Sequence, residues 1–536
     1  MKKIKHLHPA YRLFIILMIG FVIFFFTCYQ CFVQSRSNII NHDIKNNDSE
    51  TIKADHYEMT LHLDSKTHQL YGTVNLTITN QTKQKISSLY LRNYACAITG
   101  KKSIQSIYQN KKQLSFHEFG APIVLDKANI KNKMKSKDIA SIIKIQLDNR
   151  LSPKKTMTLS IQYQIDIPKR KDRFGYTKIN NQYMYQLSYC FIQLSPFING
   201  QWDNPPYIDH AEPDFNQISN YSIDMTIPDG YILVSSGHET YKGDHLYHIE
   251  AKQVRNIAMI VSNHLKKETI NFHHCQINHY YPVYDNMQDY SQYILDSAQE
   301  TMAFNTQHFG QYPYQQLDII SCYYDSAMEY SGMIFLGLPD IQNLNHLDQT
   351  SYSSLTQTVA HEVSHQWFCI ALGNDQYNEP WLDEGFAEYI EDILFPLNSK
   401  VYQKAIKDDK QRLKIDIDDI QKEQFQQKLQ QMIKQKQNQH YINEPYHQYI
   451  KYEKPDGLDH KIMITDDYSN YVYTQGSYLL YELSQAMKEN IFYQMMQDYY
   501  QTYYLKEVTT ADFINKVYQY DCSPKIHHII NKYIDK

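Results

Sequence analysis

Residues 358–368 read TVAHEVSHQWF and place two histidines, His361 and His365, four positions apart, with Glu362 directly after the first. On an α-helix, residues four apart lie one above the other on the same face, so both imidazoles can reach one metal ion. Glu362 then lies beside the ion without being a ligand, where a carboxylate can act as a general base. The alternative interpretation is that these residues form only the polar side of a helix.

A third ligand follows in the stretch NEPWLDEGFAEYIEDILF. Pro380 suits the first turn of a second helix, and Glu384 comes 19 positions after His365. Catalytic zinc sites use three protein ligands and keep a fourth position for water. The spacing therefore predicts one Zn²⁺ per chain, held by His361, His365 and Glu384. Glu388, one turn after Glu384, either supports the metal site as a neighbour of a ligand or is simply solvated.

The helix that carries the two histidines also has a predicted buried side. Leu355, Val359, Val363 and Trp367 recur every four residues in LTQTVAHEVSHQWF. Such a spacing forms an apolar stripe along one face of an α-helix. We expect this stripe to face the core, with the histidines on the opposite side.

Two kinds of pattern divide the rest of the chain. From His56 to about residue 266, stretches such as YEMTLHLD, YGTVNLTITN and TMTLSIQYQID alternate apolar and polar residues, which is typical of antiparallel strands. Beyond residue 284 the period lengthens to that of helices, with one strand-like stretch, LDIISCYY. We predict an α+β multidomain protein, with a β-sandwich-like domain over residues 53–266 and a catalytic domain over residues 267–536.

The N-terminal region has the features of a membrane anchor. Residues 13–33, LFIILMIGFVIFFFTCYQCFV, contain no charge and are long enough to span a bilayer as a helix. The stretch is longer than the apolar part of a signal peptide and lacks an Ala-x-Ala-like end, so we predict an uncleaved transmembrane helix. Residues 1–12 hold four basic residues and should be a cytoplasmic tail. A polar linker, residues 34–52, then leads to a catalytic domain outside the cell.

The bulk composition limits the classes of function. At 536 residues the chain is too long for one ordinary core, and 42% hydrophobic residues with 21% charged residues are typical of globular proteins. A net charge of -5 argues against a nucleic-acid-binding protein. The eight cysteines are scattered and form neither a disulfide framework nor a cysteine-based zinc site. The oligomeric state cannot be predicted from these features.

Four motifs together resemble a known family. HEVSHQWF, WLDEGFAEY, the upstream SAMEYSGMIFL and the downstream VYTQGSYLLYEL occur in the order found in peptidase family M1, the aminopeptidase N family of zinc metallopeptidases. The stretch GNDQYNEPWLDEG most resembles the bacterial branch of that family. The similarity to the family extends from about residue 56 to residue 500. The resemblance implies a thermolysin-like (gluzincin), mostly helical catalytic domain that hydrolyses peptides from their N-terminus.

The resemblance also implies a binding site for the substrate's amine. The family's motif is Gly-x-Met-Glu-Asn, whose glutamate holds the free α-amine, and here it reads Ser326-Ala327-Met328-Glu329-Tyr330. Glu329 takes the amine-binding role, and Ala327 and Met328 line the substrate site. Ser326 and Tyr330 depart from the motif, which leaves open a relaxed demand for a free amine.

A catalytic tyrosine is implied in the same way. Tyr473, in Tyr-Thr-Gln-Gly, matches the family's tyrosine that stabilises the oxyanion, with Gln475 in place of a lysine. Only 63 residues follow Tyr473, fewer than the family's usual C-terminal helical domain, so a more open cleft is expected.

Three hypotheses follow from these observations. The first is a membrane-anchored zinc aminopeptidase with Glu362 as general base and Tyr473 as oxyanion stabiliser. The second is a zinc endopeptidase that uses the same metal site without requiring a free amine. The third is an inactive binding protein on a peptidase fold.

Overall fold

The computed structural model describes most of the chain beyond the predicted linker. Residues 50–120, 124–125, 140–179, 181–204, 207, 215–283, 287–324, 326–337, 351–413, 442, 450–453, 461–464 and 467–534 are described. The predicted tail and transmembrane helix, residues 1–33, lie outside this set. Within the described ranges, no helix has both the length and the hydropathy that a bilayer crossing requires.

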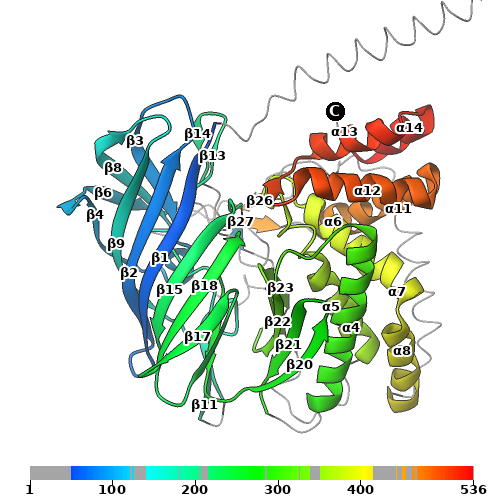
Figure 1. Cartoon of the computed structure of the whole chain (residues 1–536), viewed down its shortest axis with the longest axis horizontal. Helices are drawn as coiled ribbons and strands as arrows, with labels where there is room; N and C mark the ends of the chain where they lie inside the picture. Colours follow the sequence, from blue (N-terminus) through cyan, green and yellow to red (C-terminus); the bar gives the residue numbers. More distant parts are fainter. Residues whose placement is uncertain are drawn as a thin grey trace, which may run out of the picture. The chain divides into compact units, whose positions relative to one another are not determined.

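The β-rich part is built on an eight-stranded sheet with β1 near its centre. Alternate β1 side chains, from Tyr57 to Leu63, are buried, as the alternation in the sequence predicts. Strand β1 pairs in parallel with β15 and antiparallel with β2 (Figure 1). The strand order is β17 (His238–Gly243), β18 (Leu246–Val254), β15 (Ser219–Thr226), β1 (Ile52–Asp64), β2 (Gln69–Asn80), β9 (Thr156–Asp166), β4 (Ile104–Gln109) and β5 (Lys112–Gln113).

Two four-stranded sheets also belong to this part of the chain. Their buried residues and those of the large sheet belong to the same hydrophobic core, so the sheets bury their apolar faces together. One has the order β12 (Gln193–Leu194), β3 (Ile86–Arg92), β8 (Ile142–Leu151) and β6 (Phe116–Phe119). The other has the order β10 (Phe174–Ile179), β11 (Gln182–Leu187), β19 (Met259–Ser262) and β16 (Ile232–Ser235).

The second half begins with a five-stranded sheet where the sequence indicated only one strand. Strands β21, β22 and β24 run parallel, and β23 lies antiparallel at the edge. Strands β23 and β24 have four and five residues, too few for a periodic pattern to identify them. The order is β20 (Lys266–Phe272), β21 (Cys275–Tyr281), β22 (Gln316–Cys322), β24 (Met333–Gly337) and β23 (Ala327–Tyr330).

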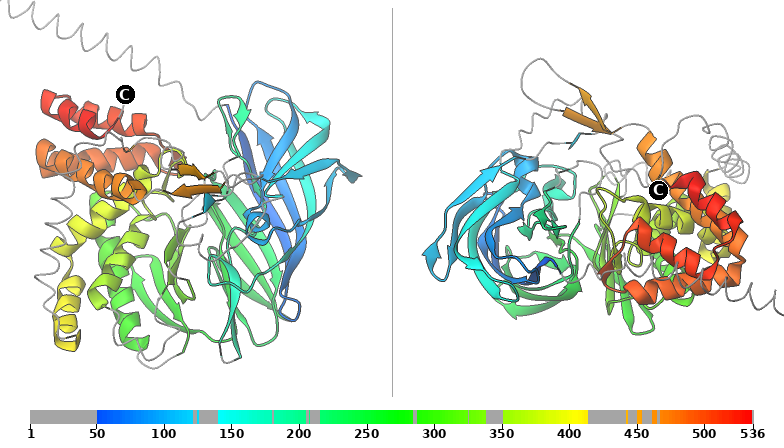
Figure 2. Two further views of the ribbon diagram at one scale, coloured as in Figure 1. Left: turned by 180° about the vertical axis from the view of Figure 1, so that it is seen from behind. Right: turned by 90° about the horizontal axis from the view of Figure 1, so that it is seen from above.

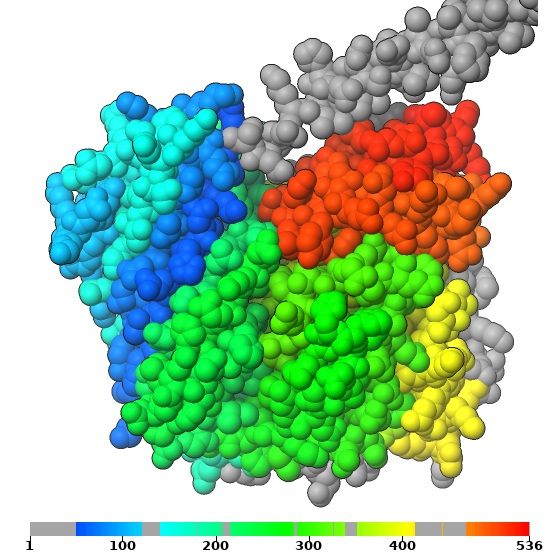
Figure 3. Space-filling model, in the orientation of Figure 1, coloured from blue at the N-terminus to red at the C-terminus, as the bar shows by residue number. Residues whose placement is uncertain are grey.

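Helices form most of the remainder of this half. Figure 3 shows the orange surface of α12 bordering the green surface of α4, and Figure 2 shows α13 and α14 beside α11 and α12. The helices are α4 (Met287–His308), α5 (Tyr352–Ser364), α6 (Trp381–Tyr389), α7 (Phe395–Asn398), α8 (Lys400–Leu413), α10 (Asp467–Ser469), α11 (Gly476–Met487), α12 (Glu489–Tyr503), α13 (Thr510–Tyr520) and α14 (Pro524–Tyr533). Two π-helical turns, η4 (Ile390–Leu394) and η6 (Asn470–Gln475), precede α7 and α11.

Candidate metal centre

Helix α5 carries the first histidine and ends just before the second. His361 lies in its last turn, and His365 is the residue that caps the helix after Ser364. The helix was predicted to include all of LTQTVAHEVSHQWF, but it ends at Ser364, and the chain turns from His365 onward. The apolar stripe is buried as predicted, with Leu355, Val359, Val363 and Trp367 no more than 6% exposed.

The three predicted ligands meet at one point. The Nε2 atom of His361 lies 3.1 Å from Oε2 of Glu384, and Nε2 of His365 lies 3.4 Å from the same oxygen. Glu384 reaches this position from the first turn of α6, which begins directly after Pro380. The sequence separation of 19 residues is spanned by the turn after α5 and the loop that precedes α6.

These separations fit a tetrahedral metal ion. Zinc bonds of about 2.0–2.1 Å at tetrahedral angles place neighbouring ligand atoms roughly 3.3–3.4 Å apart. The possible ligand atoms of His361, His365 and Glu384 all lie within 4.8 Å of one another. Two imidazoles and one carboxylate are also the donor types that zinc prefers. The residues present therefore fit this ion.

Each histidine is oriented by a hydrogen bond on its other ring nitrogen. The Nδ1 of His361 lies 2.9 Å from Oε2 of Glu391, and the Nδ1 of His365 lies 3.2 Å from the carbonyl oxygen of Phe368. Both partners are acceptors, so each Nδ1 carries the hydrogen and each Nε2 presents its lone pair to the centre. Glu391 thus has the supporting role that the sequence offered to Glu388.

Glu391 was missed in the sequence, although a signal for it exists. It follows Glu384 by seven residues, which is close to two helical turns and returns it to the same face. Glu388 also lies near, since it joins His361 and Glu391 in a group whose possible ligand atoms are within 4.8 Å. A supporting role for Glu388 stays a prediction.

The electrostatics of the three ligands favour positive charge at their centre. Burial alone would raise the pKa of Glu384, but hydrogen bonds from His361 and His365 outweigh it and hold that pKa well below its usual range. Burial would lower the pKa of His365, but the charges of Glu329 and Glu384 raise it to about 10. A divalent cation supplies the positive charge that the two imidazoles otherwise take up as protons.

Glu362 lies beside the ligands and is 6% exposed. Burial raises its pKa to about 8, and the neighbouring His361 counteracts part of this effect. A cation held by the adjacent residues would lower this pKa further, because an opposite charge favours the carboxylate form. Glu362 is therefore placed beside the ligands, where its carboxylate can act as a general base.

Tyr473 reaches the same centre from the π-helical turn η6. Its hydroxyl donates a hydrogen bond to Oε1 of Glu384 over 2.5 Å. Its ring is nearly parallel to that of His361, with the ring centroids 6.2 Å apart. The structure thus brings Tyr473 together with the ligands, 89 residues away from Glu384 along the chain.

Glu329 enters the site from the edge strand β23 and is 2% exposed. Its carboxylate lies within 4.8 Å of the possible ligand atoms of His365 and Asp383. Of its motif neighbours, Met328 and Tyr330 are buried, Ala327 is half-buried and Ser326 is exposed. The structure therefore brings Glu329 to the metal residues and leaves Ser326 at the surface.

Gln366, which the sequence reading passed over, fixes this strand against α5. Its side-chain amide donates to the carbonyl oxygen of Tyr330 and accepts from the amide of Gly332, at 2.9 and 3.0 Å. Tyr330 ends β23, and Gly332 lies on the turn between β23 and β24. Because Gln366 directly follows His365, this pair of bonds couples the position of Glu329 to that of a metal ligand.

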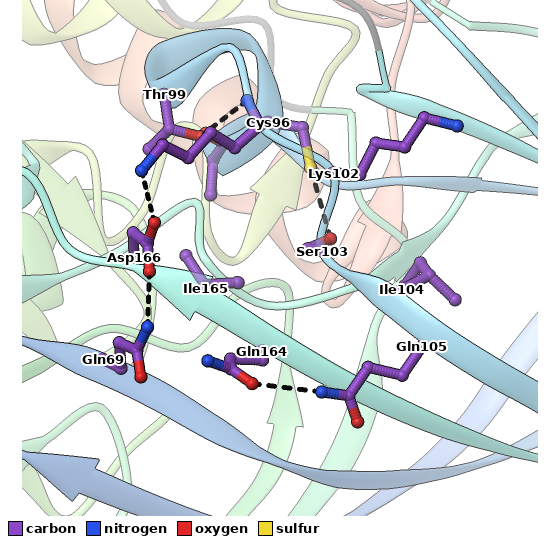
Figure 4. Close-up of a pocket in the computed structure, with 12 residues that line it drawn as sticks. Gln69, Cys96, Thr99, Lys102, Ser103, Ile104, Gln105, Gln164, Ile165 and Asp166 are labelled. Carbon is purple, nitrogen blue, oxygen red and sulfur yellow. Dashed lines mark hydrogen bonds and ion pairs between the residues drawn. The ribbon is translucent and has the colours of Figure 1, made fainter. Parts of the chain in front are cut away.

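A separate cavity of about 320 Å³ lies in the β-rich part, between α2 (Tyr94–Thr99) and strands β2, β4 and β9 (Figure 4). Its polar side chains bond to one another: Gln69 and Lys101 donate to Asp166, and Gln105 donates to Gln164. None of its lining residues belongs to the metal site. The candidate site is therefore the cluster around His361, His365 and Glu384.

Comparisons with known proteins show which sequences and folds this chain resembles. The model of the peptidase family M1 domain matches residues 293–533. Aminopeptidase 2 of Candida albicans is 29% identical over 125 residues, which cover 22% of this chain and 13% of that protein. Human endoplasmic reticulum aminopeptidase 1 is 34% identical over 105 residues, which cover 18% and 11%. The matches thus span little more than a tenth of these relatives' length.

Solved structures have a fold similar to that of this chain over 91% of its length. An M1 zinc metallopeptidase from Deinococcus radiodurans superposes with a TM-score of 0.55 at 14% identity, covering 91% of this chain and 94% of that one. A mutant of a two-domain M1 zinc metallopeptidase bound to L-arginine gives a TM-score of 0.56 at 14% identity, covering 91% and 95%. These likenesses show a two-domain fold with a β-rich N-terminal domain. The family match identifies residues 293–533 as a peptidase family M1 domain.

Proposed function

We propose that this chain is a zinc aminopeptidase that removes N-terminal residues from peptides. The observation that carries the proposal is the meeting of both Nε2 atoms, from His361 and His365, at one oxygen of Glu384. Glu362, Tyr473 and Glu329 surround this point with a proton acceptor, a hydroxyl donor and an anionic partner for an amine. The relatives named aminopeptidases support the same function.

Glu362, Tyr473 and Glu329 each have a separate role in the reaction. When bound there, zinc supplies Lewis acidity, which makes water a stronger acid and polarises a carbonyl oxygen. Glu362 accepts the proton of the attacking water on its carboxylate and returns it to the leaving amine. The Tyr473 hydroxyl exchanges its hydrogen bond to Glu384 for one to the substrate. It then donates to the carbonyl oxygen, which becomes negative as the carbonyl is attacked. Glu329 binds the protonated α-amine and thereby places the first peptide bond at the reacting point.

The experiment pairs one peptide with its N-acetylated form. We expect the zinc-loaded protein to cleave the free peptide and to spare the acetylated one. Glu362→Gln should keep its zinc and lose about a thousandfold in kcat, because general-base catalysis contributes on this scale. Glu489→Gln, an exposed acid on α12, is the matched control. Equal cleavage of the acetylated peptide would replace the proposal with an endopeptidase, and no cleavage of any peptide would indicate a binding protein.

We also propose that residues 13–33 anchor the enzyme in the cell membrane, with the N-terminus in the cytoplasm and the catalytic domain outside. The support is the uncharged 21-residue stretch and the basic residues that precede it. The full chain should remain in the membrane fraction after alkaline washing, and protease added to intact cells should digest its catalytic domain. Recovery in the soluble fraction with a new N-terminus after residue 33 would contradict the anchor.

A further inference from the structure

The side chain of Gln376 lies between two buried acids of the candidate site. Gln376 belongs to the loop between β25 (Leu372–Gly373) and α6, and it is 5% exposed. Its Nε2 donates to Oδ2 of Asp383 over 2.9 Å and to Oε1 of Glu329 over 3.2 Å. An amide nitrogen carries two hydrogens and can serve both acceptors. One side chain therefore joins Glu329, the proposed amine-binding acid, to a second acid beside the metal ligands.

This bridge matters because the two carboxylates are close and shielded from water. Glu329 is 2% exposed and Asp383 is fully buried, and both belong to one group with His365 whose polar atoms lie within 4.8 Å. Two like charges in a buried site repel each other strongly. Donors placed between them offset the repulsion and let both acids keep fixed orientations.

Cys369 acts on the same oxygen of Glu329. Its Sγ lies 3.5 Å from Oε1, and the Nε2 of Gln376 lies 3.4 Å from that sulfur. Cys369 has a φ of +131°, a region that residues with a side chain rarely adopt. Both contacts reach Oε1 and so hold that oxygen of Glu329 in place. A strained backbone at this position is consistent with a functional constraint on Glu329.

We propose that Gln376 is a positioning residue that makes the site selective for peptides with a free, protonated α-amine. This inference rests on the proposed function and deepens it. The amine binds Glu329, whose orientation Gln376 sets, and it also lies in the field of Asp383, which Gln376 ties to the same place. Without the bridge, Glu329 rotates away from Asp383, and the preference for a charged amine over a neutral amide falls.

The test measures binding and needs no turnover. Zinc-loaded protein is titrated calorimetrically with L-leucinamide and with N-acetyl-L-leucinamide, and the ratio of the two affinities is the readout. We expect Gln376→Met to reduce this ratio about tenfold, since hydrogen bonds to charged groups are worth this much. Cys369→Ala should reduce it less, because a thiol is a weak donor. Affinity for the acetylated compound, zinc content and melting temperature should stay as in the wild type.

A matched control and a second variant complete the design. Gln316→Met removes another amide that joins two acceptors, Gly237 and Asp318, outside the candidate site, and it should keep the wild-type ratio. Gln376→Leu also removes the donor, adds no charge that would itself attract the amine, and should lower the ratio to the same extent. This variant serves as the test if Gln376→Met has a lower melting temperature than the wild type.

The outcomes separate this inference from the proposed function. A wild-type ratio in both Gln376 variants overturns the inference, as does a wild-type protein that binds the two compounds equally. A second outcome is that the wild type prefers L-leucinamide and the variants lose this preference, while the wild type hydrolyses no free peptide. This result would overturn the aminopeptidase proposal and leave Gln376 as the residue that selects the amine.

Discussion

Gly385 in helix α6 and Gly476 at the start of helix α11 touch backbone to backbone: a Cβ on Gly476 would come within 2.9 Å of the Gly385 Cα. Real side chains essentially never approach this closely, and both atoms belong to rigid helices. The close approach has a direct effect on the site. Glu384 precedes one glycine and Tyr473 precedes the other by one helical turn, so the contact sets the distance between carboxylate and hydroxyl.

Gly476→Ala should therefore move Tyr473 away from the reacting point. We expect kcat for peptide hydrolysis to fall at least about tenfold, because misplacement of a catalytic group by an ångström is costly. Zinc content should remain, since all three ligands lie outside the moved segment. Gln485→Ala, at an exposed position of the same helix, is the control. An unchanged kcat for Gly476→Ala would separate the glycine contact from the placement of Tyr473.

Glu391→Ala should weaken metal binding. The carboxylate accepts the Nδ1 hydrogen of His361 over 2.9 Å and so fixes the ring for ligation. Loss of such a partner usually reduces metal affinity by about 10- to 100-fold. Competition with a chromogenic chelator measures the zinc Kd directly, with the exposed Glu489→Ala as the comparison. Equal zinc affinity in the two variants would remove Glu391 from the metal site.

Asp409→Ala should loosen the N-terminus of the histidine-bearing helix. This fully buried carboxylate on α8 accepts from the backbone amides of Tyr352 and Ser353 at 2.9 and 2.8 Å, and from the Ser351 hydroxyl at 2.9 Å. A buried backbone amide that loses its hydrogen-bond acceptor costs about 1–3 kcal/mol of stability. Hydrogen exchange of the α5 amides should show a local opening free energy lower by about this amount. The exposed Lys407→Ala is the control, and equal protection in the two variants would contradict the prediction.

His279 should make folding stability depend on pH. The imidazole is fully buried between the hydroxyls of Ser291 and Ser321, at 2.9 and 2.8 Å, and burial lowers its pKa to about 3. The unfolded chain, with a histidine pKa of about 6.5, then binds an extra proton between about pH 3 and pH 6.5. Stability is complete above this window and is lost as the pH falls through it.

The expected size of this effect is measurable. Between pH 7 and pH 5, His279 should cost about 2 kcal/mol of unfolding free energy. Urea unfolding at the two pH values should show the loss in the wild type, and His279→Gln should remove that share of it. His273→Gln, at an exposed turn, should leave the pH dependence unchanged. A pH dependence in His279→Gln as steep as the wild type's would sink the prediction.

The sequence alone predicted the parts of the site that depend on local geometry. The spacing of His361 and His365 reflects the helical repeat, and Glu384 follows on the next helix, so backbone periodicity is enough to propose three ligands and a base. The alternation in β1 predicted its buried face for the same reason. Glu329 and Tyr473 required the resemblance to a family, because an isolated glutamate or tyrosine carries no pattern.

Only the tertiary structure decided which distant segments meet. Gln376 reaches Glu329 across 47 residues, and Gly385 meets Gly476 across two helices that no periodicity pairs. The four-residue strand β23 and the π-helical turn of Tyr473 are too short or too irregular to leave a periodic signal. Repeats in a sequence arise from the geometry of one element, whereas the orientation of Glu329 and the placement of Tyr473 arise from packing between elements, which local patterns do not encode.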